Sequence, residues 1–111
     1  MRELPALVCK LGQFCDAWLV GSAAEPDVVW KRVKDFDVMV PFHMWHHATL
    51  LIPKDATPNT FGGWKCVSEG RKVDVWSGEI GSLASSSLSN DFMYHLNSAT
   101  LLTKTRVIVD G

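Results

Sequence analysis

The chain has 111 residues, of which 47% are hydrophobic and 21% are charged. Because domains usually hold ~100–200 residues, we expect a single domain over residues 1–111, and this composition excludes a disordered chain, a collagen and a coiled coil. Eleven Lys and Arg residues against twelve Asp and Glu residues give a formal net charge of −1, so the chain as a whole has no basic field to hold nucleic-acid phosphates non-specifically.

The cysteines and the apolar runs indicate the cellular compartment of the protein. Cys9, Cys15 and Cys66 are an odd number of cysteines and lack the paired spacing of a metal site. The N-terminus lacks the long apolar stretch of a signal peptide, and no apolar run approaches the ~20 residues needed to cross a bilayer. We therefore expect a protein of the reducing cytoplasm that makes no membrane contact.

The first part of the chain predicts one helix and two strands. Apolar residues at helical spacing predict an amphipathic helix over residues 4–16. The apolar run 18–20 ends at Gly21-Ser22, which indicates a buried strand followed by a tight turn, and residues 23–33 fit either a short helix or a loop. Charged and apolar positions alternate over 34–40, which predicts a strand that Pro41 ends.

The remainder predicts a second helix and a hairpin. Residues 42–51 lack helix breakers and predict a helix that Pro53 stops, followed by a polar loop closed by Gly62-Gly63. The short runs 64–68 and 72–76, separated by 69–71, predict a β-hairpin. Residues 92–102 are apolar and 106–109 predict a last strand. Together these elements predict an α/β fold with a small mixed β-sheet and helices mainly on one face.

Three aspartates lie in these predicted strands. Asp35 and Asp37 are two residues apart, so on a strand their side chains share one face with their Cα atoms ~6–7 Å apart. If the hairpin strand that carries Asp74 lies beside them, the three carboxylates can form an oxygen cage suited to Mg²⁺ or Mn²⁺. An Asp-x-Asp pair alone is weak evidence, but the Gly21-Ser22 turn that precedes it can bare N–H and hydroxyl groups to triphosphate oxygens.

The ordered motifs WLVGSAA (18–24), KDFDVMV (34–40) and KVDVW (72–76) resemble those of the DNA polymerase β-like nucleotidyltransferase superfamily. The resemblance spans residues 4–77 and implies the minimal core of that fold. It implies that Gly21 and Ser22 bind the β- and γ-phosphates of an NTP such as ATP. It also implies that Asp35, Asp37 and Asp74 are catalytic and bind metal, with Asp74 as the base for the acceptor hydroxyl.

The chain departs from the superfamily pattern after the Gly-Ser turn. The stretch between Ser22 and the first aspartate is longer than the short turn often seen, and Ala24 stands where a basic residue often follows. Lys31, Arg32 and Lys34 are therefore alternative contacts for the triphosphate.

The resemblance implies a Mg²⁺-dependent nucleotidyltransferase that moves an NMP from an NTP to a hydroxyl and releases pyrophosphate. A chain of this length leaves no room for a separate acceptor domain, so we expect a small-molecule, protein or RNA acceptor, and a homodimer or a partner protein can complete the site. Two alternatives stay open at this point: a non-catalytic nucleotide- or partner-binding module of the same fold, and a metal-dependent phosphohydrolase.

Other side chains admit a less specific interpretation. His43, His46 and His47 provide at most a partial zinc ligand set, and structural or solvated histidines are the favoured reading. Trp30 and Trp45 are the better candidates for base stacking, because the other tryptophans fall in predicted strands, where core packing is favoured.

Overall fold

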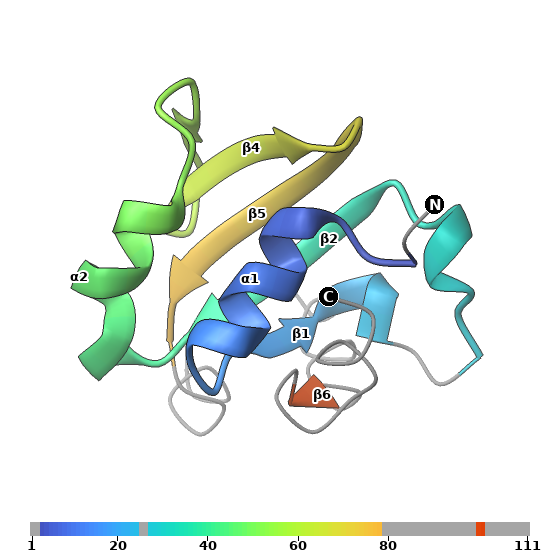
Figure 1. Ribbon diagram of the computed structural model, residues 1–111, viewed down its shortest axis with the longest axis horizontal. Helices are drawn as coiled ribbons and strands as arrows, with labels where there is room; N and C mark the ends of the chain where they lie inside the picture. Colours follow the sequence, from blue (N-terminus) through green and yellow to red (C-terminus); the bar gives the residue numbers. More distant parts are fainter. Residues whose placement is uncertain (1–2, 25–26, 79–99, 102–111) are drawn as a thin grey trace.

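A computed structural model describes residues 3–24, 27–78 and 100–101 (Figure 1). Its central element is a mixed sheet in the order β3-β4-β5-β2-β1-β6, and the strands are β1 (Trp18–Val20), β2 (Asp35–Val40), β3 (Thr57–Pro58), β4 (Trp64–Ser68), β5 (Arg71–Ser77) and β6 (Thr100–Leu101). The predicted small mixed α/β sheet is confirmed. The expected last strand at 106–109 and most of the apolar segment at 92–102 lie outside the described residues.

Helix α1 (Ala6–Phe14) covers one face of this sheet (Figure 1). Its apolar stripe and alternate residues of β2 and β5 are buried together in one core, which includes Leu7, Leu11, Phe36, Val38 and Val75. The helix begins one residue after Pro5, whose fixed φ suits the position before a first turn. The helix predicted over 4–16 is thus present in a shorter form, because its first residues are extended.

The pairing of β2 with β5 determines which side chains meet. These two strands are parallel, whereas β1 pairs antiparallel with β2 and β4 pairs antiparallel with β5. The predicted hairpin of β4 and β5 is confirmed. Its two-residue turn has positive φ at both Glu69 (52°) and Gly70 (77°), the conformation that matches the twist of the flanking strands.

The segment 42–51 is helical throughout but divided, as η3 (Phe42–Met44), α2 (Trp45–Ala48) and η4 (Thr49–Leu51). The polar loop that follows contains one unexpected element, the edge strand β3. Pro58 can belong to this strand because proline has no N–H, and a residue on an edge strand need not donate a hydrogen bond to a second neighbour. Within the described ranges, no helix is long and apolar enough to cross a bilayer.

Candidate functional site

The face of the sheet opposite the α1-covered core carries the predicted aspartates. Side chains alternate along β2, so Phe36, Val38 and Val40 are buried in the core while Asp37 is half-buried on the other face. The register of β2 with β5 places Asp37 directly beside Asp74, which is also half-buried. Neighbouring strands lie ~4.8 Å apart, so the two carboxylates share one small surface. The two strands are thus neighbours, which is the condition on which a shared carboxylate site depends.

The Gly21-Ser22 turn lies against this pair of carboxylates. β1 ends at Val20, which pairs with Asp37, and the chain then enters the short 3₁₀ helix η1 (Gly21–Ala24). Gly21 has φ of +73°, and a Cβ added to it would collide with the Asp37 carboxylate oxygen Oδ2. Both the backbone conformation and the close approach require glycine here. Ser22 follows with an exposed side chain.

Asp35 is placed differently from the other two aspartates. It is the first residue of β2 and is exposed. Its register partner on β5 is Lys72 rather than a carboxylate. Among the residues that the structure describes, no group of three or more His, Cys, Asp and Glu side chains is gathered closely enough to hold a metal ion. The three aspartates therefore form an opposed pair with a third carboxylate one strand repeat away, instead of the closed cage that their spacing suggested. The offset arises because Asp35 and Asp37 are two residues apart on one strand.

A residue that sequence reasoning missed holds Asp74 in place. Asn59 donates from Nδ2 to Asp74 Oδ1 (3.2 Å) and to the Trp64 carbonyl (3.1 Å). Its Oδ1 accepts the backbone N–H groups of Phe61 (3.0 Å) and Gly63 (2.9 Å). One side chain thus closes the 59–63 turn and fixes a carboxylate on β5. The Pro-Asn-Thr sequence signalled a turn, but the partner 15 residues away could not be deduced from it.

We expect Asn59→Ala to lower the free energy of unfolding by about 2–3 kcal/mol, because several hydrogen bonds worth ~0.5–1.5 kcal/mol each are lost together. Urea denaturation followed by tryptophan fluorescence measures this change. The matched control is Thr60→Ala, since Thr60 is the exposed neighbour in the same turn, and its loss should stay within ~0.5 kcal/mol. Equal losses for the two variants would mean that Asn59 does not organise the turn.

Asp37, Asp74 and Lys65 lie side by side across β2, β5 and β4, and Lys65, the register partner of Asp74, is exposed.

The next residue of β4, Cys66, is buried, and its thiol contacts the Val73 carbonyl at 3.4 Å. Burial, aided by the carboxylates of Asp74 and Asp55, raises the pKa of the Cys66 thiol to about 11. This thiol is therefore protonated at neutral pH and is not a nucleophile.

The histidines and the proposed stacking tryptophans lie elsewhere. His43, His46 and His47 are exposed on the helical segment 42–51. The Trp30 indole N–H donates to the Ala23 carbonyl at 2.9 Å, and Trp30 and Trp45 both pack against the core. Both residues are partly buried, so packing against the core accounts for part of each side chain's surface.

Comparison of the chain with protein-family models, curated proteins and solved structures gives no match.

Proposed function

We propose that this protein is a Mg²⁺-dependent nucleotidyltransferase that moves a nucleoside monophosphate from an NTP to a hydroxyl and releases pyrophosphate. The proposal rests on the register that opposes Asp37 to Asp74, with the Gly21 backbone packed against the same Asp37 carboxylate. A glycine turn, a first carboxylate strand and a parallel second carboxylate strand are adjacent in space as well as ordered along the chain. This arrangement supports the polymerase β-like core that the motifs resemble.

The donor atoms suit a hard divalent cation. Asp35, Asp37 and Asp74 offer only carboxylate oxygens, the ligands that Mg²⁺ and Mn²⁺ prefer. Since Mg²⁺ usually keeps several waters and takes one or two protein carboxylates together with substrate phosphates, Asp37 and Asp74 would be a sufficient contribution from the protein. When bound, such ions neutralise phosphate charge and lower the barrier to displacement at phosphorus.

The residues of the chain have distinct tasks in this reaction. The exposed Ser22 hydroxyl and the adjoining backbone N–H groups donate to oxygens of the β- and γ-phosphates. Asp74, oriented by Asn59, accepts the proton of the acceptor hydroxyl. The hydroxyl oxygen then bonds to the α-phosphorus as the bond to the β-phosphate breaks, and pyrophosphate leaves. The protein contributes mainly position and charge.

Nucleotide and metal should stabilise the protein only in combination. We expect Mg²⁺ with an NTP at ~10 times its Kd to add about 1.4 kcal/mol, a rise in Tm of roughly 6–11 °C for a chain of this size, and either component alone to add much less. Differential scanning fluorimetry with each of the four NTPs, with and without Mg²⁺, makes the comparison. An unchanged Tm under every condition would contradict the proposed nucleotide site.

Two rival functions predict different products from the same carboxylates. A metal-dependent phosphohydrolase would release orthophosphate, whereas a nucleotidyltransferase releases pyrophosphate. A non-catalytic nucleotide-binding module would show the combined rise in Tm and no product at all.

A further inference from the structure

A concave surface of about 780 Å³ lies between the 31–34 segment and the β4–β5 turn. Five of the residues that line it are basic: Lys31, Arg32, Lys34, Arg71 and Lys72. The whole chain has only eleven Lys and Arg residues, so nearly half of them gather at this one place. We call this surface the basic cleft. A chain of net charge −1 thus carries a local positive field that its overall composition conceals.

Part of this charge is committed to the fold. The Arg71 guanidinium donates from Nη1 to the carbonyls of Glu3 (2.8 Å) and Trp30 (3.0 Å) and lies 5.2 Å from the centre of the Phe36 ring. The acidic residue at the turn, Glu69, accepts the Ala6 backbone N–H at 2.6 Å. These contacts fix the walls of the cleft by joining the N-terminal segment, the 30–32 turn and the hairpin.

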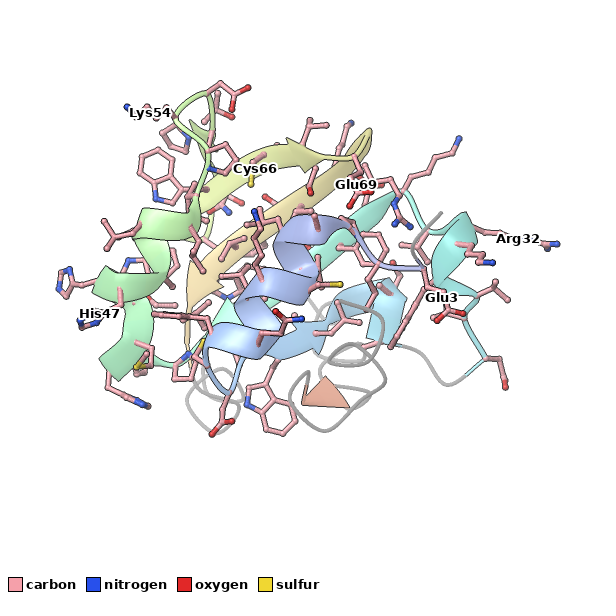
Figure 2. All side chains as sticks on the ribbon, viewed as in Figure 1. Glu3, Arg32, His47, Lys54, Cys66 and Glu69 are labelled. Atoms are coloured by element: carbon pink, nitrogen blue, oxygen red, sulfur yellow. The ribbon has the colours of Figure 1, made fainter. Side chains whose placement is uncertain are left out.

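The remaining cations are free to meet a ligand. Lys31, Arg32, Lys34 and Lys72 are all exposed, and among the residues that the structure describes none of the four forms an ion pair. A backbone bond from Lys72 N–H to the Lys34 carbonyl (2.8 Å) holds the two strands that carry them together. In Figure 2, Arg32 extends outward from its helical turn. The five cations of the lining outnumber its two carboxylates, Asp35 and Glu69, and such a surplus favours an anionic ligand.

The composition of the lining selects phosphates over bases. None of the side chains in the cleft is aromatic, so it offers no platform on which a base can stack. Lysine ammonium groups act as mobile point charges, which suits a series of phosphodiesters contacted without regard to sequence.

The cleft shares one residue, Asp35, with the proposed active site. Asp35 belongs to its wall and lies one strand repeat from Asp37 on the same face of β2. We propose that the basic cleft binds the sugar–phosphate backbone of a single-stranded nucleic acid and brings its terminal hydroxyl to Asp74, so that the acceptor class is a polynucleotide. This inference rests on the proposed nucleotidyltransfer, in which that hydroxyl oxygen bonds to the α-phosphorus, Asp74 takes its proton and pyrophosphate leaves.

Fluorescence anisotropy with labelled 12-nucleotide single strands of RNA and of DNA tests the proposal. With four phosphate contacts, the slope of log K against log salt should be about −2.8, and Lys31→Gln/Lys34→Gln should reduce its magnitude by about 1.4 and weaken binding roughly tenfold at low salt. The matched control, Lys10→Gln/Lys54→Gln, removes the same charge from two exposed lysines outside the cleft and should change the Kd less than twofold. Lys54 lies on the loop at the opposite end of the molecule from Arg32 (Figure 2). Arg32→Gln/Lys72→Gln provides a second, independent pair.

Four outcomes would overturn the proposal. Equal weakening by the control pair would show that only net charge matters. Tight binding of a poly-glutamate peptide at the same salt would show a general anion surface. If Lys31→Gln/Lys34→Gln abolished the Mg²⁺·NTP rise in Tm and spared oligonucleotide binding, the cleft would be a triphosphate contact. Absence of oligonucleotide binding with that rise in Tm intact would refute the polynucleotide acceptor alone and leave nucleotidyltransfer standing. A preference for RNA or for DNA would identify which of the two polynucleotides is the acceptor.

Discussion

Asp74→Asn should still bind Mg²⁺·NTP, more weakly because one of two carboxylate ligands is lost, but should transfer nothing measurable, a loss of at least ~100-fold in turnover. Asp37 and the Gly21-Ser22 turn still provide carboxylate and N–H contacts to the nucleotide, whereas the group that takes the acceptor proton is gone. The lost interaction belongs to the transition state, so kcat falls more than binding. Asparagine keeps the size of the side chain and an oxygen that can accept the hydrogen bond from Asn59. Thermal shift measures binding, and transfer of label from an α-labelled NTP measures turnover.

The matched control for this variant is Asp27→Asn, which removes one charge from an exposed aspartate outside the carboxylate pair. It should retain full transfer activity. Wild-type turnover in folded Asp74→Asn would exclude Asp74 as the base and remove the main support for the enzymatic proposal.

Gly21→Ala should both destabilise the protein and abolish transfer. A residue with a side chain at positive φ costs ~1–2 kcal/mol, and the added Cβ would in addition collide with the Asp37 carboxylate, whose side chain would have to move. Displacement of Asp37 from its place beside Asp74 should lower turnover at least ~100-fold.

Gly62→Ala separates the two costs, because Gly62 has a similar φ of +80° and nothing within 4 Å of an added Cβ. It should lose only the backbone part of the stability and retain activity. Urea denaturation of both variants and transfer assays decide the matter. If Gly21→Ala lost no more stability than Gly62→Ala and kept full activity, the close approach of this turn to Asp37 would not be needed for function.

Local patterns predicted most of the individual elements of this fold. Helical spacing in the first 16 residues, the alternation over 34–40 and the Glu69-Gly70 turn each depend on neighbours in sequence, and each prediction is confirmed in its main part. The break of the 42–51 segment into three short helical pieces and the strand at Thr57–Pro58 were not visible, because they depend on what the segment packs against.

The candidate site shows the same division between local and long-range information. The two-residue repeat of a strand correctly predicted that Asp35 and Asp37 share one face. It contains no information on how β2 is aligned with β5, so it did not reveal that Asp37 lies beside Asp74 while Asp35 lies beside Lys72. The hydrogen bond from Asn59 to Asp74 and the basic cleft depend on segments far apart in sequence. Net charge concealed the cleft because acidic residues elsewhere cancel its cations.

The central claim is transfer of a nucleoside monophosphate, and the fate of two labels tests it most directly. The protein is incubated with Mg²⁺, single-stranded oligonucleotides and a cell extract as acceptor sources, and ATP labelled at either the α- or the γ-phosphate. We predict that the α label becomes attached to an acceptor while the γ label is released as pyrophosphate, and that Asp74→Asn does neither. Release of the γ label as orthophosphate, with no α label on any acceptor, would contradict nucleotidyltransfer and identify a phosphohydrolase.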